Sequence, residues 1–476
     1  MHRHHKPGLI DLLTDMSFLL RTRKALYLLG FFCVLVTAVS ADEAKTTPLL
    51  TTLPATTISG YVDASATSGP SSVTTKSLSG DYVTPLGGET LLLGNVNGDQ
   101  VWSSLSLTPN GGYIVWEDNG IDKVGAGVGA RHFLDSSLTP APASFVVNRV
   151  AVGDQITPQV ACLANKSTLF IWQSMAAGTP DIWGRLMRSN GVFATIDFRV
   201  NTYLKDAQAH PAVAALADGG AVIVWQSAWQ DGNPNGIFAR KLTSTSVLTP
   251  LREFEINEYK STSQYRSQRT NRRNPAVALL ANGNFVVVWV SEQQRAINSL
   301  DIYGRIFAPN LTPVTDEFLV NSSTNACSDP AVSGFSDGGF TVVWSERDFH
   351  NRNNSWDVAG RSFMGDATPK GDEFIVNTYR FGDQYQPKIA SSPNGCLVVW
   401  TSMGQDGSRE GVFGQFLLGG NQLAGPEITV NTTRVSQQLE PAVAWNGVDR
   451  FLVVWSGFVA QYGFDLFGQS YVLSSP

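Results

Sequence analysis

The chain has 476 residues, of which 43% are hydrophobic and 16% are charged, and its formal net charge is −6. This apolar content is enough for a sizeable core, and the low charge excludes a largely disordered chain. The mild acidic excess carries no global signature of nucleic-acid binding. At roughly 150 residues per domain, the length fits about three domains or one large repeat fold.

The N-terminus has the layout of a secretory signal peptide. An apolar run at 25–39 follows a basic segment at 21–24 and precedes small residues that end at Ala41. The run is shorter than the roughly 20 apolar residues that a membrane-spanning helix needs, which makes a retained anchor the weaker alternative. We therefore expect cleavage of residues 1–41 and a secreted or cell-surface protein with no stable membrane insertion.

A second segment, residues 42–86, is rich in Thr, Ser, Pro and Gly. Such a stretch cannot bury enough apolar surface to fold, so it is predicted to be a disordered linker. The folded domain is expected to span residues 87–476.

The sequence gives only weak signals for disulfides and for N-glycosylation. After the signal peptide three widely spaced cysteines remain, which is no disulfide framework, although one pair among them is left open. These are Cys162, Cys327 and Cys396. Glycosylation sequons predict attachment sites if the source is eukaryotic. The sequons begin at Asn165, Asn310, Asn321, Asn353 and Asn431.

The most informative signal is an internal repeat. A β-branched run that ends in tryptophan, such as VVVW or LVVW, recurs seven times at intervals of 53 to 64 residues. The tryptophans are Trp116, Trp172, Trp225, Trp289, Trp344, Trp400 and Trp455. Each unit holds four strand-like pieces: one that follows a proline, one that ends in the tryptophan, one of the form DIWGRLM, and one of the form FxVN.

Four short antiparallel strands per unit are typical of the blade of a β-propeller. The last unit stops after its third strand, and the missing strand occurs at the other end of the domain as ETLLLGN from Glu89. Because an open blade would expose an unpaired edge, we predict an all-β, seven-bladed propeller that this N-terminal strand closes.

These residues resemble a known group of repeats. The repeated VVVW and FxVN strings, together with the QDG loop at Gln230-Asp231-Gly232 and Gln405-Asp406-Gly407, are similar to those of large bacterial secreted and surface adhesin-like proteins. The resemblance covers residues 88–476 and implies fold more than chemistry, because the function of the group is mostly undefined. The QDG loop is intact in only two units, which weakens any shared function of this loop.

Several repeated positions have a structural interpretation. A glutamine lies three residues before the strand-opening proline in most units, where it can bond backbone groups of the crossover between units. An arginine recurs inside the third strand, where a bond to a neighbouring carboxylate or carbonyl is expected. The seven tryptophans end alternating strands, so we expect them in the core and not on a sugar-binding surface.

Ligand contacts are expected on the face that carries the crossovers and the loops between second and third strands. An enlarged crossover from Asn257 is basic in an otherwise acidic chain and could attract acidic glycans. Aromatic residues outside the repeat pattern are further ligand candidates. The predicted ligand-binding residues are Tyr265, Arg266, Arg269, Arg272, Arg273, Trp229, Trp356 and Tyr385, and Trp102 and Trp445 share the aromatic pattern.

The leading interpretation of the sequence is a secreted or cell-surface binding protein, leaning away from an enzyme, whose ligand is a glycan or an extracellular protein. Few histidines remain after the signal peptide, and no catalytic, metal-ligating or cofactor-binding motif is present, so none of these roles is assigned. Two carboxylates are enough for a glycosidase, however, and a pair such as Asp231 with Glu292 keeps a carbohydrate-active enzyme as the alternative. A structural matrix component is a second alternative, and the oligomeric state is left open.

Overall fold

The computed structural model describes residues 82–259, 270–347 and 355–474, and in this part of the chain the secondary structure consists of strands β1 to β28. The predicted signal peptide, most of the predicted linker, Tyr265, Arg266, Arg269 and Asn353 lie outside the described residues. The described residues belong to one unit, which spans Thr75–Pro476. No helix that could cross a membrane occurs within these described ranges.

The strands form seven antiparallel sets of four, which we call blades 1 to 7. Five blades are separate four-stranded sheets that follow the chain order β2–β5, β6–β9, β18–β21 and β22–β25, with β26–β28 completed by β1. Blades 3 and 4, β10–β13 and β14–β17, are joined into one eight-stranded sheet through a single parallel bridge between Asn235 and Asn271. The predicted all-β propeller is therefore confirmed.

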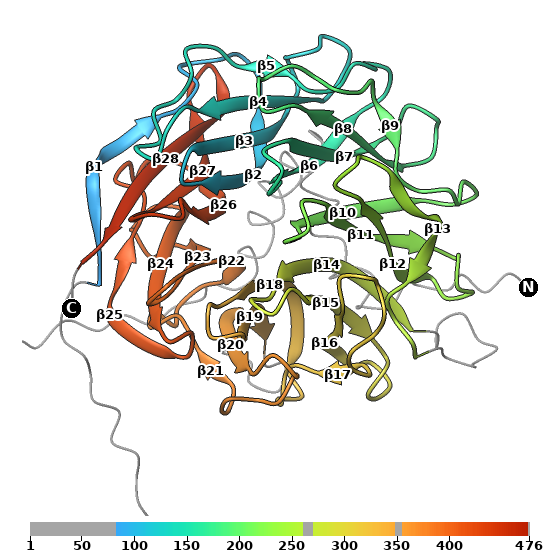
Figure 1. Cartoon of the computed structure of the whole chain (residues 1–476). Helices are drawn as coiled ribbons and strands as arrows, with labels where there is room; N and C mark the ends of the chain where they lie inside the picture. Colours follow the sequence, from blue (N-terminus) through green and yellow to red (C-terminus); the bar gives the residue numbers. More distant parts are fainter. Residues whose placement is uncertain (1–81, 260–269, 348–354, 475–476) are drawn as a thin grey trace, which may run out of the picture. The chain divides into compact units, whose positions relative to one another are not determined.

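The innermost strand of each blade is the one that follows the crossover, and Figure 1 shows these seven strands around the centre of the ring. The innermost strands are β2 (Gln100–Thr108), β6 (Gln155–Cys162), β10 (Gln208–Ala215), β14 (Asn271–Leu279), β18 (Ala326–Gly334), β22 (Gln384–Ser392) and β26 (Gln438–Trp445). The second strands carry the tryptophans. They are β3 (Gly111–Asp118), β7 (Thr168–Ser174), β11 (Ala221–Ala228), β15 (Phe285–Glu292), β19 (Phe340–Arg347), β23 (Gly395–Met403) and β27 (Arg450–Val459).

The third and fourth strands lie toward the rim. The third strands are β4 (Gly127–Phe133), β8 (Asp181–Met187), β12 (Asn235–Leu242), β16 (Leu300–Phe307), β20 (Asp357–Phe363), β24 (Glu410–Leu418) and β28 (Gly463–Leu473). The fourth strands are β5 (Phe145–Val146), β9 (Phe198–Arg199), β13 (Leu248–Glu255), β17 (Phe318–Leu319), β21 (Phe374–Ile375), β25 (Gln422–Thr429) and β1 (Val83–Leu91).

The ring closes through the N-terminal strand, as the sequence indicates. Strand β1 pairs antiparallel with β28, from Val83 opposite Leu473 to Leu91 opposite Phe467. The strand begins at Val83, inside the segment predicted to be linker, because Val83 is buried in the apolar cluster between blades 6 and 7 and Tyr82 stacks on Phe416. The folded domain therefore starts before the predicted boundary at residue 87.

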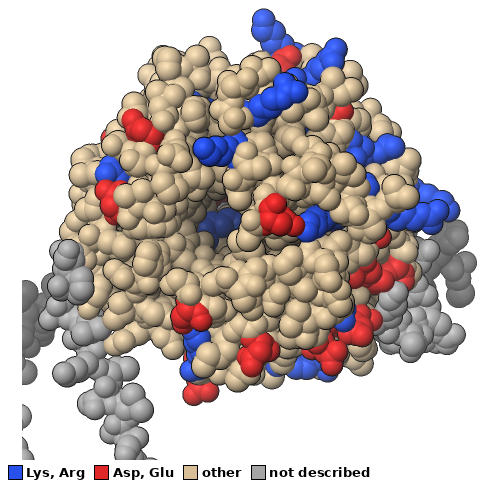
Figure 2. All heavy atoms as spheres, in the orientation of Figure 1, with Lys and Arg blue, Asp and Glu red and all other residues tan. Residues whose placement is uncertain are grey.

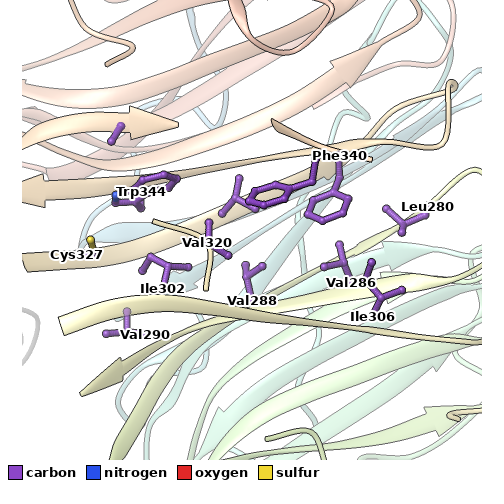
Figure 3. Close-up of a cluster of buried hydrophobic side chains, with 13 residues drawn as sticks. Leu280, Val286, Val288, Val290, Ile302, Ile306, Val320, Cys327, Phe340 and Trp344 are labelled. Carbon is purple, nitrogen blue, oxygen red and sulfur yellow. The ribbon is translucent and has the colours of Figure 1, made fainter. Parts of the chain in front are cut away.

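Apolar clusters fill the seams between neighbouring blades. Between blades 4 and 5, Val286, Val288 and Ile302 meet Phe340 and Trp344 (Figure 3). All seven repeated tryptophans are at most 1% exposed, which confirms their predicted place in the core. Full burial of such a side chain removes a large apolar area from water, so these seams supply much of the stabilisation of the ring.

Polar side chains connect the blades at equivalent places. The recurring arginine of the third strand in blades 1 to 5 donates to a carbonyl of the preceding blade, as Arg240 does to the oxygen of Val200 at 2.8 Å. The FxVN asparagine accepts the N–H that opens the third strand, as Asn377 does from Val358 at 2.7 Å. Both side chains keep their identity because the backbone around them needs those particular bonds.

Two predicted glycosylation sites fall on these framework asparagines. Asn321 and Asn431 are at most 1% exposed, and the amide nitrogen of Asn321 donates to Asp301 and to the oxygen of Ser323. A glycan on that nitrogen would break both bonds and could not fit, so the prediction is wrong for these two sequons. Asn165 and Asn310 are exposed. The three described cysteines, Cys162, Cys327 and Cys396, are free thiols.

Candidate functional site

Every innermost strand contains a β-bulge near its start, and the bulge turns one residue into an unusual conformation. The pairing register shifts at the same place in all seven strands, and the residue at the shift has a φ between 49° and 57°. These residues are Trp102, Thr157, His210, Asn274, Asp329, Gln386 and Glu440, which we call the bulge ring.

Left-handed backbone is unfavourable for residues other than glycine, and such strain tends to gather at functional sites. Bulges also re-aim side chains and are frequent beside active sites. The seven members of the bulge ring have seven different side chains, whereas the neighbouring framework positions keep theirs. Because a fold requirement would repeat one residue type, the variation makes the bulge ring a candidate for ligand contact.

The bulge ring lies around one end of a central channel. The innermost strands contact one another in cyclic order, from β2 through β26 and back to β2. The crossovers and the loops after the second strands also lie at this end, since the N–H of Met403 bonds the oxygen of Asp383 and the N–H of Phe458 bonds that of Gln437. Figure 2 shows a hollow at the centre of one face, with a Lys or Arg side chain deep inside it.

Asp329 and Lys388, from neighbouring innermost strands, influence each other electrostatically. Burial raises the pKa of the Asp329 carboxyl, against the opposing influence of Lys388 and Arg273 and of bonds from Ser328 and Ser345. Burial likewise lowers the pKa of Lys388, against the influence of Asp329. Lys388 is nevertheless solvent-exposed, and an innermost strand can expose a side chain only into the channel.

Glu440 lies on the other side of Lys388 from Asp329, because its strand β26 follows β22 around the ring. One oxygen of Glu440 accepts the backbone N–H of Trp102 at 3.0 Å, which connects blade 7 to blade 1 across the closing seam. Its negative charge also favours the charged form of Lys388. A backbone N–H and an ammonium group both stabilise the ionised form of a carboxylate.

Asp329, Lys388, Glu440 and Trp102 therefore lie on the innermost strands of four consecutive blades, 5, 6, 7 and 1, and Lys388 comes two residues after the bulge-ring member Gln386. Asn274 of blade 4 extends this row, because its amide donates to Asp329 at 3.4 Å. Perturbed carboxyl groups in a recessed polar site are candidates for acid–base chemistry. Among the described residues, no group of three or more His, Cys, Asp or Glu side chains is arranged to hold a metal ion.

Of the basic side chains predicted to bind ligand, the structure describes Arg272 and Arg273, and both are paired with acids. Arg272 is fully buried, donates to the oxygen of Tyr259 and forms an ion pair with Asp231 at 3.6 Å. Arg272 stands where five other blades have the framework glutamine, so it performs a structural role, and the prediction that it binds ligand is wrong. Arg273 is ion-paired with Glu292.

The same contacts exclude Asp231 and Glu292 as the pair of catalytic carboxylates that the sequence suggested. The side chain of Asp231 is 0% exposed and accepts a hydrogen bond from the Asn257 amide. Glu292 is ion-paired with Arg273 and accepts a hydrogen bond from the Asn271 amide. Neither acid is free to serve a substrate. The channel carboxyls Asp329 and Glu440 were missed, although their place directly before a proline in the innermost strand could have marked them as equivalent positions.

The aromatic candidates fall in different places. Tyr385 is next to the bulge of β22, and burial is the largest of the causes that raise its pKa, followed by the nearby Glu410 and Glu440. Trp229 lies in the loop between β11 and β12, and Trp356 precedes β20, where its N–H bonds Asp383. Trp445 packs against Phe451 in the core. Trp102 is the aromatic member of the bulge ring itself.

One cavity of about 250 Å³ lies at the closing seam near the rim. Its wall includes Leu86, Leu92, Phe133, Leu138 and Leu452, and no ionisable side chain contributes to it. This apolar cavity offers no group for acid–base chemistry, so the channel remains the better candidate site.

No protein-family model matches the chain, and no curated protein matches it. Solved structures do share its fold. The polysaccharide lyase Uly1 is 8% identical, with a TM-score of 0.51 over 79% of this chain and 90% of the lyase. An α-L-arabinofuranosidase from Fusarium graminearum is 12% identical, with a TM-score of 0.46 over 69% of this chain and 98% of that one. An α-L-arabinanase from Penicillium chrysogenum is also 12% identical, with a TM-score of 0.45 over 81% and 99%.

At these identities the likeness shows the fold alone, a β-propeller. The polysaccharide lyase, the one of these three with a TM-score above 0.5, is named as an enzyme that acts on polysaccharide. This finding overturns our leading interpretation of the sequence, a binding protein that leans away from catalysis. The alternative, a carbohydrate-active enzyme with carboxylates on the loop face, replaces it as the hypothesis for the channel site.

Proposed function

We propose that the protein is a carbohydrate-active enzyme that hydrolyses a glycan at the bulge-ring end of the central channel, with Asp329 and Glu440 as its two carboxyl groups. The observation that carries this proposal is the bulge ring, which presents two acids from different blades beside an exposed lysine. Cleavage of a glycosidic bond by water needs one carboxyl that donates a proton and one carboxylate that acts on the opposite side of the sugar.

The environments assign the two roles. Asp329 has a raised pKa, so it keeps its proton to higher pH than a solvent-exposed aspartate and can protonate the departing sugar oxygen. Glu440 has an N–H and an ammonium group beside it, so it acts as the carboxylate that activates water or attacks the sugar. Trp102, adjacent to Glu440, offers a ring face on which a sugar can stack.

The N-terminal pattern supports an extracellular place of action, where polymeric glycans are accessible to an enzyme. We include secretion in this proposal, and it is tested separately by N-terminal sequencing of the protein recovered from culture medium. Cleavage near Ala41 is the expected result, and retention of residues 1–41 would remove this part of the proposal.

The test of the activity is an assay of the full chain on neutral polysaccharides such as arabinan and galactan and on acidic ones such as polygalacturonate. We expect new reducing ends from one class, and a loss of at least roughly 100-fold in kcat for Asp329→Asn and for Glu440→Gln. The matched control is Asp366→Asn, which changes an exposed acid in the short turn after β20. Equal activity of all four proteins would overturn the site, and an unsaturated elimination product would overturn the hydrolytic roles.

A further inference from the structure

Blades 3, 4 and 6 share a network that fixes each crossover. In blade 6 the Ser402 hydroxyl donates to Gln405 at 2.8 Å, and the Gln405 amide donates to Glu427. Glu427 in turn accepts the N–H of Thr378, which lies in the crossover from blade 5. Blades 3 and 4 have the same three-part arrangement, through Gln230 with Glu253 and through Gln294 with Glu317.

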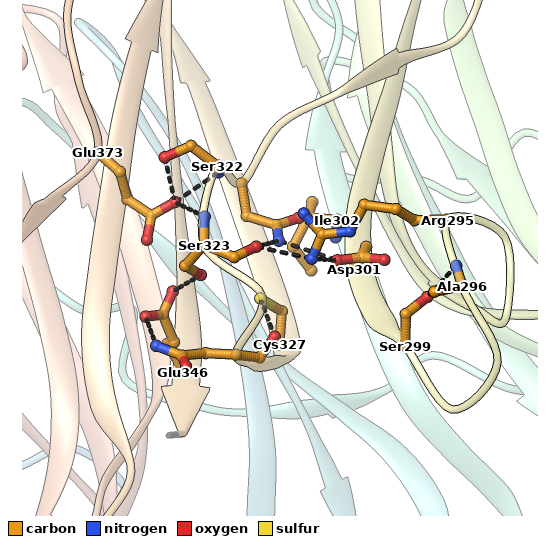
Figure 4. Close-up of polar contacts among 12 residues, drawn as sticks. Arg295, Ala296, Ser299, Asp301, Ile302, Ser322, Ser323, Cys327, Glu346 and Glu373 are labelled. Atoms are coloured by element: carbon orange, nitrogen blue, oxygen red, sulfur yellow. Dashed lines mark hydrogen bonds and ion pairs between the residues drawn. The ribbon is translucent and has the colours of Figure 1, made fainter. Parts of the chain in front are cut away.

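Blade 5 replaces this network. The position two residues after the tryptophan is Glu346 instead of serine, and this residue is 6% exposed. One of its oxygens accepts the Asn325 amide at 2.6 Å, and the other accepts the Ser323 hydroxyl at 3.0 Å (Figure 4). The second oxygen also accepts the Trp344 indole N–H at 3.1 Å.

The final member of the network is unchanged. Glu373 accepts the N–H of Ser322 at 2.7 Å and that of Ser323 at 3.3 Å, as its equivalents do in the other blades. In blade 5, however, Glu373 and the carboxyl of Glu346 meet at the same residue, because Glu373 accepts the N–H of Ser323 and Glu346 accepts its hydroxyl. Two carboxyl groups can share a hydrogen bond only if one of them keeps a proton.

We propose that Glu346 and Glu373 share one proton, and that this proton fastens blade 5 to the crossover from blade 4. The pair then does what the glutamine amide does in blades 3, 4 and 6, but only while it is protonated. The proton makes this seam sensitive to pH, whereas in the equivalent seams of blades 3, 4 and 6 the donor to the glutamate is a glutamine amide, which does not titrate.

The charged and titratable surroundings agree with a retained proton. Burial is the largest cause that raises the pKa of Glu346, to about 7, and the Glu373 carboxyl raises it further against the bond from Asn325. Cys327 faces the pair from β18, and its own pKa is raised by burial and by Glu346. Arg295, the nearby cation from the loop after β15, already pairs with Asp301 and donates to the oxygen of Ser323.

The sign of the effect follows from linkage. An unfolded glutamate titrates near 4.3, below the value for folded Glu346, so between these pH values the folded chain binds one proton more than the unfolded chain. The contribution to stability is therefore complete below about pH 4.3 and is lost as the pH rises through about 7. Above that range both carboxyls are charged and repel each other.

The experiment is chemical unfolding of the intact chain from pH 5 to 9, for the natural sequence and for Glu346→Gln. Glutamine can donate to Glu373 as Gln405 does to Glu427, so this variant is expected to fold. Relative to it, the unfolding equilibrium constant of the natural chain should rise by up to about tenfold per pH unit between pH 5 and 7 and then level off. Parallel curves for the two proteins would overturn the proposal.

A reciprocal variant in blade 6 provides the matched test. Gln405→Glu places a carboxyl against Glu427 and should create the pH dependence that Glu346→Gln removes. If Gln405→Glu unfolds with the same pH profile as the natural chain, a shared proton is not what such a carboxyl pair provides, and the proposal fails.

Discussion

The rim-side framework and the bulge ring obey opposite rules, although both repeat once per blade. In the framework the same residue types recur, and their side chains are used up by bonds such as those of Arg240 and Asn377. In the bulge ring the backbone geometry recurs while the side chains differ, from Trp102 to Glu440. In this repeat protein, constant identity therefore marks folding positions, and constant geometry with variable identity marks the positions available for chemistry.

The strongest way to break this comparison is to remove the closing strand. Deletion of residues 82–92 takes away β1, the buried Val83, and the bonds from the N–H groups of Thr432 and Thr433 to Glu89. We expect a loss of more than about 4 kcal/mol in unfolding free energy, because β28 would expose an unpaired edge. Thermal unfolding followed by circular dichroism measures this loss, and an unchanged melting temperature would show that the ring does not depend on β1.

A single framework side chain should have a smaller effect. Arg240→Ala removes donors from the carbonyls of Val200 and Pro250 and leaves them in a buried place, so we expect a loss of about 2 to 3 kcal/mol. Urea unfolding measures it, with the exposed Arg188→Ala as the control. The folded fraction should keep its full activity, and a specific loss of kcat in Arg240→Ala would blur the distinction between framework and ring.

A ring side chain should show the reverse behaviour. Trp102→Ala is expected to raise KM roughly five- to tenfold through loss of a sugar-stacking surface, with little change in unfolding free energy. Trp102→Phe, which keeps an aromatic face, should restore most of the affinity. Steady-state kinetics and chemical unfolding of the same preparations measure KM and stability separately. A stability loss without a change in KM would show that Trp102 serves the fold and not substrate binding.

The finest test concerns the electrostatics of the ring. The Lys388 ammonium lowers the pKa of Asp329, so Lys388→Met should raise that pKa further. The general acid would then stay protonated to higher pH, and the alkaline limb of the kcat/KM profile should move upward. Lys388→Arg, which keeps the charge, should leave the limb in place. A shift toward lower pH would contradict the role of Asp329 as the acid.

Much of the fold could be predicted because repetition exposes it. The seven tryptophans, the FxVN asparagines and the incomplete last unit together specify the blades and their closure before any contact is known. Burial of the tryptophans and the structural use of Gln155 and Gln384, which donate to crossover carbonyls, follow from the same regularity.

The candidate site was harder to predict for a physical reason. Asp329 and Glu440 precede prolines, and a residue in that position is normally driven into extended backbone, where it would not have been re-aimed by a bulge. Arg272 was wrongly predicted to bind ligand, because a basic residue in an enlarged crossover is normally expected to be exposed to solvent. Its burial depends on Asp231 of the preceding blade, a partner that no local pattern reveals.

The pairing of β1 with β28 also determines when the protein can finish folding. Val83 is among the first residues of the domain to leave the ribosome, and its partner Leu473 is among the last. Contacts of such large sequence separation form slowly, and nascent sheets with open edges are prone to aggregate. Blade 7 can therefore form only after β28 has been synthesised, and a cell that makes this protein has to shield β1 and the other strands of that blade until then.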